Sequence, residues 1–203
     1  MLGVARSRRL ADMHLMIPNL TYEDRRRSLG RLALWWVETF SLIGRGGATG
    51  KPVTHSPEYI QFYLNAYALK PDGRRRFNRV SLWRPKGCNK SGLGNDLALF
   101  EAFGPCRFDH WAKPGETYTF LGQTYYYLPG EPVGRPVQRP EILCLATSED
   151  QSGNIFDSIY YNCTSGPLAQ LQGFGMEVTK TRIGFPWGDY SHDFRRCVEG
   201  WWS

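Results

Sequence analysis

Histidine and cysteine are scarce and scattered in this sequence. Four histidines and five cysteines occur in 203 residues, and the cysteines form no Cys-x-x-Cys pair. An odd number of widely spaced cysteines does not suggest a disulfide framework, and a zinc site needs ligands at close spacing. We therefore expect free thiols, as in a reducing cytoplasm, and no zinc site.

Long apolar runs are also missing. No run approaches the roughly 20 residues that cross a bilayer, and no signal-peptide stretch follows the arginines at positions 6, 8 and 9. We therefore expect no membrane partner. The formal net charge of +6 is a mild basic excess, which fits a protein that meets nucleic acid or nucleotide phosphates.

The first half of the chain carries two helical patterns. Residues 1–20 show no periodicity and are expected to form a flexible N-terminus. Thr21 and Asp24 have capping-box spacing, and apolar residues then recur every three or four positions through residue 43. A second helix is predicted over residues 56–67, which open with a capping serine and a proline suited to the first helical position.

The second half suggests alternating strands and helices. We predict a short strand over residues 77–83, a polar loop over 84–91 and a helix over 92–103. Residues 105–140 are rich in proline, glycine and tyrosine, and we expect an insertion with short strands there. The apolar run 141–147 predicts a buried strand of a largely parallel sheet.

A further helix is predicted over residues 150–163. Together with the preceding strands and helices, it gives the element order of an α/β fold.

The loop 84–91 is the segment with the clearest chemistry. A phosphate-binding loop surrounds phosphate oxygens with backbone N–H groups, and it ends in a lysine for the β- and γ-phosphates and a hydroxyl for magnesium. Lys90 and Ser91 provide that ending. Arg84 and Asn89 replace the two glycines of the usual pattern, and asparagine tolerates the left-handed backbone that the second glycine would adopt.

Residues 83–91, Trp-Arg-Pro-Lys-Gly-Cys-Asn-Lys-Ser, resemble the Walker A loop of the terminase large subunits of tailed phages, commonly Pro-Lys-Gly-x-Gly-Lys-Ser in the actinobacteriophage branch. Residues 35–38 and the glycine-rich loop 44–50 are similar to the entry segment of that family. Residues 145–157 resemble its strand-helix segment, and residues 177–183 give a fainter match. The resemblance spans about residues 20–186.

This resemblance implies a P-loop NTPase fold of the ASCE type, with a mostly parallel sheet. Residues 21–186 would form part of the ATPase domain, with 105–140 as an insertion. Gln61 would bind adenine, Ser91 would bind Mg²⁺, and Lys90 and Arg84 would act in catalysis. The phosphates of ATP would be held by Arg84, Pro85, Lys86, Gly87, Cys88, Asn89, Lys90 and Ser91.

In that family, ATP hydrolysis drives viral double-stranded DNA into a procapsid in the cytoplasm of the bacterial host. The resemblance therefore implies three further partners, namely the terminase small subunit, the portal protein and other copies of the same chain.

The pattern of the family breaks after Pro186. No apolar strand ending in Asp-Glu, the Walker B motif, follows, and residues 187–203 are unlike the family. We therefore expect a chain that stops before the catalytic half and is inactive alone. Residues 198–202, Val-Glu-Gly-Trp-Trp, are encoded by GTN GAR GGN TGG TGG, which allows Ser-Lys-Asp-Gly-Gly one nucleotide later. That stretch resembles the segment before Walker B, so we hypothesise a frameshift near residue 186.

Two other interpretations stay open. The chain could be a module that binds nucleotide or DNA without catalysis, with the basic groups 25–27 and 74–76 contacting phosphates. It could also be an inactive remnant whose sheet lacks its later strands and leaves an edge open to aggregation.

Overall fold

The computed structural model describes residues 20–44, 46–85, 87–138, 140–146, 149–186 and 193–198. The α-helices are α2 (Tyr22–Arg26), α3 (Gly30–Phe40), α4 (Pro57–Ala66), α5 (Lys90–Phe103) and α6 (Glu149–Ser165), and η1 (Pro167–Phe174) is a 3₁₀ helix. The strands are β1 (Arg107–Trp111), β2 (Thr117–Phe120), β3 (Gln123–Tyr126), β4 (Pro132–Arg135), β5 (Ile142–Ala146), β6 (Glu177–Val178), β7 (Arg182–Gly184) and β8 (Asp193–Val198).

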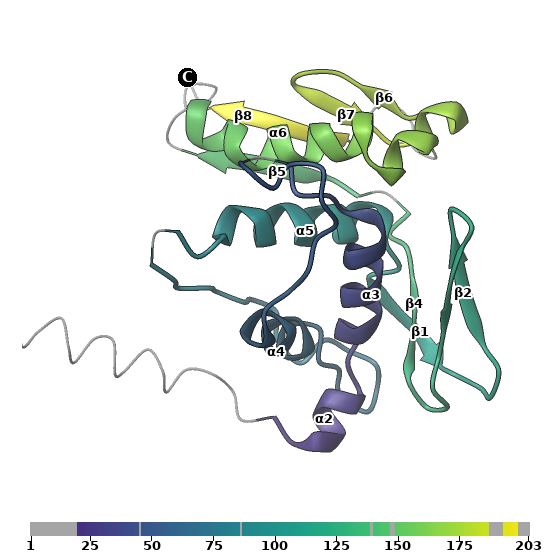
Figure 1. Ribbon diagram of the computed structural model, residues 1–203. Coiled ribbons are helices and arrows are strands. Elements are labelled where there is room, and N and C mark those ends of the chain that lie inside the picture. Colours follow the sequence, from purple (N-terminus) through teal and green to yellow (C-terminus); the bar gives the residue numbers. More distant parts are fainter. Residues whose placement is uncertain are drawn as a thin grey trace, which may run out of the picture.

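The helices α3, α4 and α5 form the centre of the molecule (Figure 1). The strands β1 to β4 lie on one side of α3, and α6 with the strands β5 to β8 lies beyond α5. The core between these parts is aromatic: Trp36, Phe40 and Phe100 are fully buried, and the ring of Trp36 contacts the other two rings. Each such side chain contributes about 1.5–3 kcal/mol by burial.

The predicted capping box at Thr21 is confirmed, because the Asp24 backbone N–H donates to the Thr21 hydroxyl and Asp24 accepts from the Thr21 backbone. The single helix predicted over 21–43 is wrong, however, because the chain leaves the helix at residues 27–29. There the Ser28 hydroxyl donates to the Leu64 carbonyl oxygen at 2.8 Å. This hydrogen bond ties the junction between α2 and α3 to the end of α4.

Close contact between α3 and α4 requires a glycine at position 30. A Cβ added to Gly30 would lie 2.6 Å from the carbonyl oxygen of Tyr63, which is well inside van der Waals contact. Any other residue there would push the two helices apart. The predictions of α4, α5 and α6 are confirmed, with α5 starting two residues earlier than expected.

The segment 105–140 forms two small antiparallel sheets, β1–β4 and β2–β3. Aromatic side chains dock the second sheet on α3, since Trp35 contacts the rings of Tyr118 and Tyr125. Consecutive tyrosines at the end of β3 face opposite sides: Tyr126 is 75% exposed, whereas Tyr127 is 5% exposed. The expected insertion is therefore part of the core, and its short strands are confirmed.

The remaining strands form a four-stranded sheet in the order β5-β8-β7-β6, covered by α6 (Figure 1). The predicted strand β5 is confirmed, and it pairs parallel with β8. Among the described strands this is the one parallel pairing, so a mostly parallel sheet stays a prediction. β8 belongs to the tail 187–203, of which residues 187–192 and 199–203 lie outside the described residues, as do residues 1–19 of the expected flexible N-terminus.

The strand predicted over residues 77–83 is wrong. The chain runs there without helix or strand, and no described strand pairs with it. Val80 is 48% exposed and Trp83 is 75% exposed, so these apolar residues are not buried on a sheet. A strand is stable only when a neighbour takes up its backbone hydrogen bonds, and nothing in the local pattern reports whether a neighbour exists.

Candidate functional site

The loop 84–91 leads directly into the N-terminus of α5. Gly87 has a φ of 89°, and Asn89 has a φ of 52° and a ψ of 33°. The left-handed conformation predicted for Asn89 is therefore confirmed. A left-handed residue followed by right-handed ones turns successive backbone N–H groups toward one side, which creates a concavity suited to anions. The Asn89 side chain at the N-cap position of α5 makes no capping hydrogen bond.

Lys90 is the first residue of α5, and its side chain turns back over the loop. Its Nζ donates to the carbonyl oxygen of Arg84 at 2.8 Å and to that of Pro85 at 2.7 Å. Ser91 lies beside it in the first turn of the helix, and both residues are exposed. Lys86 lies outside the described residues. The loop is thus closed on itself by one ammonium group, with a hydroxyl next to it.

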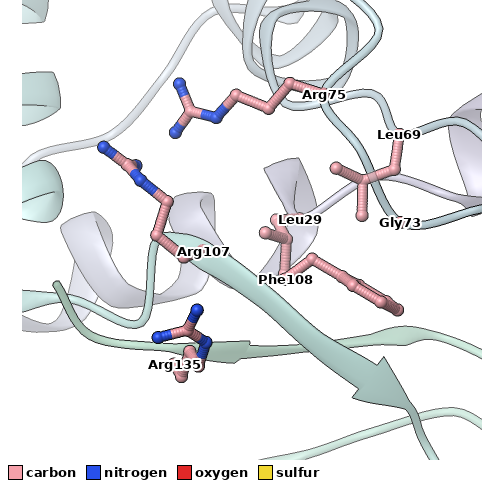
Figure 2. Close-up of a pocket in the computed structure, with 7 residues that line it drawn as sticks. All are labelled: Leu29, Leu69, Gly73, Arg75, Arg107, Phe108 and Arg135. Atoms are coloured by element: carbon pink, nitrogen blue, oxygen red, sulfur yellow. The ribbon is translucent and has the colours of Figure 1, made fainter.

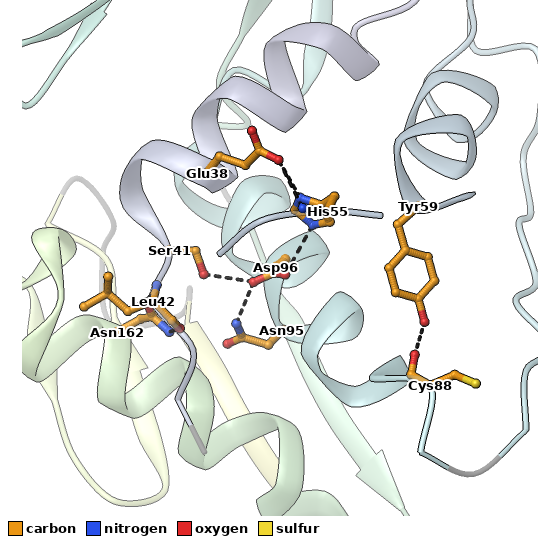
Figure 3. A network of polar contacts seen from close by, with 9 residues as sticks. All are labelled: Glu38, Ser41, Leu42, His55, Tyr59, Cys88, Asn95, Asp96 and Asn162. Carbon is orange, nitrogen blue, oxygen red and sulfur yellow. Dashed lines mark hydrogen bonds and ion pairs between the residues drawn. The ribbon is translucent and has the colours of Figure 1, made fainter. Parts of the chain in front are cut away.

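The first turn of α4 holds the loop from the other side. The Tyr59 hydroxyl donates to the Cys88 carbonyl oxygen (Figure 3), and Glu58 pairs with the guanidinium of Arg84. The hydrogen bond to Glu58 raises the pKa of Arg84 above its ordinary value. In this arrangement Arg84 is engaged by a carboxylate rather than directed freely into the loop.

Gln61 lies one turn further along α4, on the helix that holds the loop. Its Nε2 donates to Asn65 Oδ1 at 2.8 Å. The structure therefore brings the helix of Gln61 against the loop 84–91, but the amide itself is engaged within α4.

A buried polar network lies between α3, α5 and the segment before α4 (Figure 3). The His55 side chain is 3% exposed, and its Nδ1 lies 3.2 Å from Glu38 Oε1. Its Nε2 lies 3.6 Å from Asp96 Oδ2, an ion-pair distance longer than a hydrogen bond. Asp96 Oδ1 accepts from Ser41 Oγ at 2.8 Å and from Asn95 Nδ2 at 3.0 Å.

The charge of His55 is controlled by these partners. Burial disfavours the imidazolium, but the contacts with Asp96 and Glu38 outweigh it and raise the pKa of His55 above its ordinary value. This network was not predicted from the sequence. Its signal was the polar pair Asn95-Asp96 inside an apolar helix, a position where a buried polar group needs partners.

The two basic groups proposed for DNA contact are largely neutralised by neighbouring carboxylates. Asp24 pairs with Arg27 at 3.2 Å and with Arg76 at 2.7 Å, so it brings the two groups together. Arg74 lies 3.7 Å from Asp72. This arrangement fits solvated faces better than a DNA-binding surface.

Within the part of the chain that the structure describes, no group of three or more histidine, cysteine, aspartate or glutamate side chains is placed to hold a metal ion. No helix among the described residues has the length and apolar character needed to cross a bilayer. No protein-family model, curated protein or solved structure matches the chain. The resemblance to terminases therefore depends on the sequence motifs alone.

Proposed function

We propose that the loop 84–91 binds the triphosphate of ATP with Mg²⁺, and that the chain is the nucleotide-binding part of a DNA-packaging motor of the terminase type. The observation that carries the proposal is the position of Lys90 at the start of α5, with its ammonium on two carbonyl oxygens of the loop. A phosphate can replace the two carbonyl oxygens as the hydrogen-bond partner of this ammonium, because its charge makes the contact stronger than a contact with a neutral carbonyl.

The backbone of the loop supports the same assignment. The left-handed Asn89 and the uncapped N-terminus of α5 leave amide hydrogens available to phosphate oxygens. Ser91 is exposed beside Lys90, where its hydroxyl would bind Mg²⁺. Bound Mg²⁺ would supply charge neutralisation between the β- and γ-phosphates.

The wider proposal keeps the P-loop NTPase fold of the ASCE type and the role of Gln61 in adenine binding. Viral double-stranded DNA, the terminase small subunit, the portal protein and further copies of the chain would be its partners in the cytoplasm of a bacterial host. The sequence motifs alone support this part, since residues 77–83 before the loop form no strand.

Calorimetry with Mg-ATP tests the phosphate assignment. We expect saturable binding to the wild-type chain and binding about tenfold or more weaker in Lys90→Ala, since a hydrogen bond between charged groups contributes about 1.5–3 kcal/mol. Lys70→Ala is the matched control, because Lys70 is an exposed lysine outside the loop. Equal titration of wild type and Lys90→Ala would exclude the assignment.

A steady-state ATPase assay separates binding from turnover. After Pro186 the sequence has no apolar run that ends in Asp-Glu, the pair that would organise magnesium and activate the attacking water. We therefore expect binding with negligible hydrolysis. Appreciable hydrolysis that depends on Lys90 would show that the water-activating group lies elsewhere in the chain.

A further inference from the structure

A pocket of about 310 Å³ lies between the turn after α4 and the β1–β4 sheet (Figure 2). Its lining has two halves. Three arginines, Arg75, Arg107 and Arg135, form one side, and Leu69 and Phe108 form the other. The pocket lies beyond the C-terminal end of α4, whereas the loop 84–91 contacts the first turn of that helix, so the two are separate.

The arginine side of the pocket carries more positive than negative charge. Arg75 Nη2 lies 2.7 Å from Glu101 Oε1, and Arg107 Nη1 lies 2.6 Å from Glu101 Oε2, so one carboxylate is shared by two guanidinium groups. The third, Arg135, has its Nε 3.8 Å from Asp109 Oδ1, which is too long for a hydrogen bond. An excess of positive charge therefore faces the pocket.

The pairing of β1 with β4 places two of these arginines directly opposite each other. Arg107 and Arg135 are register partners in the antiparallel ladder. Like charges at such a position repel and destabilise the sheet, unless an anion lies between them. Among the residues that the structure describes, the carboxylate nearest to Arg135 is that of Asp109, at the 3.8 Å given above.

The guanidinium groups of Arg75 and Arg107 also have N–H donors that form no hydrogen bond within the described residues. Each has five N–H donors, and within the described residues Arg75 forms hydrogen bonds only through its Nη2 and Arg107 only through its Nη1. The Arg75 guanidinium also lies over the ring of Tyr67, 5.2 Å from its centroid. The remaining donors are available to oxygen atoms of a ligand. Planar guanidinium groups match the oxygens of phosphate in pairs, which favours this type of anion.

The apolar half of the pocket is closely packed. Gly73 has a φ of +79°, and a Cβ added there would lie 2.2 Å from Cδ1 of Phe108, so the ring rests directly on the bare backbone of the turn. Trp111 packs against the same ring at a centroid distance of 4.8 Å. An apolar group can therefore bind beside Phe108 without a rearrangement of the pocket.

We propose that this pocket binds a phosphorylated small molecule, with its phosphate between Arg107 and Arg135 and its apolar part against Leu69 and Phe108. The phosphate relieves the repulsion across the β1–β4 ladder and accepts from the free donors. The concave shape and a volume near the lower end of ordinary ligand sites suit a small molecule rather than a nucleic-acid duplex.

Calorimetry with phenyl phosphate at low ionic strength tests this site, because the probe combines a phosphate with an apolar ring. The titrations use the full chain carrying Lys90→Ala, so that the loop 84–91 does not contribute. We expect saturable binding, tighter than that of inorganic phosphate, and about tenfold weaker binding when Arg135→Ala is added. Arg135 is suited to substitution because it is more than half exposed and its loss leaves no buried carboxylate unpaired.

Arg79→Ala in the same background is the matched control, since Arg79 is an exposed arginine outside the pocket, and its binding should equal that of the parent. Absence of saturable phenyl phosphate binding, or equal affinity with and without Arg135, would overturn the site. Binding of a DNA duplex through Arg135 without any binding of phenyl phosphate would overturn the small-molecule assignment. Failure of ATP to bind the loop 84–91 would leave these results unaffected.

Discussion

The side-chain amide of Asn162 forms hydrogen bonds with both the backbone N–H and the backbone carbonyl oxygen of Leu42. The Leu42 N–H donates to Asn162 Oδ1 at 2.6 Å, and Asn162 Nδ2 donates to the Leu42 carbonyl oxygen at 3.0 Å (Figure 3). Asn162 is fully buried on α6, and Leu42 follows α3, 120 residues earlier in the chain. This pair of bonds joins α6, which covers the four-stranded sheet β5-β8-β7-β6, to the end of α3.

We expect Asn162→Ala to lower the free energy of unfolding by about 2–4 kcal/mol, because two backbone groups of Leu42 lose their partners and an unsatisfied buried group costs about 1–3 kcal/mol. Urea denaturation followed by circular dichroism measures the change. Asn78→Ala is the control, since Asn78 is exposed. If Asn162→Ala lowers the free energy of unfolding no more than the control does, the two hydrogen bonds between Asn162 and Leu42 do not stabilise the fold.

The folded protein should lose stability as the pH rises through the raised pKa of His55. Because the pKa of His55 is higher in the folded state than in the unfolded state, the imidazolium stabilises the fold below the unfolded value of about 6.5. This stabilisation disappears above the folded pKa. Glu38 and Asp96 are the charged groups that face the ring, and the ring of Tyr63 packs against it at a centroid distance of 5.0 Å.

The measurement is the unfolding free energy of wild type and His55→Gln between pH 5.5 and 9. The wild type should lose more stability over this range, and the difference should be about 1–3 kcal/mol at the acidic end, as expected for hydrogen bonds between charged groups. His110, whose pKa is also raised by Asp109 and Glu116, stays in both proteins and cancels in the comparison. Parallel pH profiles would contradict the role assigned to His55.

Local signals in the sequence predicted the elements that local forces decide. The helices α4, α5 and α6 follow apolar periodicity, and Asn89 adopts the left-handed conformation because its short polar side chain tolerates it. The tyrosines at the end of β3 alternate in exposure as the pleat of a strand requires. These features depend on neighbours within a few residues.

The failures of prediction all involve partners far along the chain. The helix break at Ser28 depends on a hydrogen bond to Leu64, 36 residues away. Residues 77–83 have strand-like composition but no described strand to pair with. The partners of His55, Glu38 and Asp96, lie 17 or more positions away along the chain, so the polar pair in α5 signals a need for partners but does not identify them.

The Tyr59 hydroxyl should increase the affinity of the loop 84–91 for the nucleotide without contacting the nucleotide. This hydroxyl donates to the Cys88 carbonyl oxygen, so Tyr59→Phe removes one of the two contacts of the loop with α4 and leaves the Glu58–Arg84 pair. We expect Mg-ATP affinity to fall by about threefold to tenfold, the equivalent of one ordinary hydrogen bond, with little change in stability. Calorimetry compares it with Tyr22→Phe, a change at an exposed tyrosine. Unchanged affinity would mean that the loop holds its shape without the Tyr59 hydrogen bond.

Cys88 should report nucleotide binding through its reactivity. Burial raises the pKa of the Cys106 and Cys163 thiols to about 12, so both are almost entirely protonated at pH 8, and a thiol must lose its proton to react. Cys88 is only half-buried in the loop that we assign to ATP. With iodoacetamide at pH 8, the peptide containing Cys88 should be modified before those of Cys106 and Cys163, as mass spectrometry would show.

Mg-ATP should slow the modification of Cys88 several-fold, because a bound triphosphate covers the loop. In Lys90→Ala this protection should disappear, while the rate without nucleotide stays close to that of wild type. Unfolding in urea should make Cys106 and Cys163 react as fast as Cys88, which confirms that burial caused their protection. Equal protection of Cys88 in wild type and Lys90→Ala would place the nucleotide somewhere other than the loop 84–91.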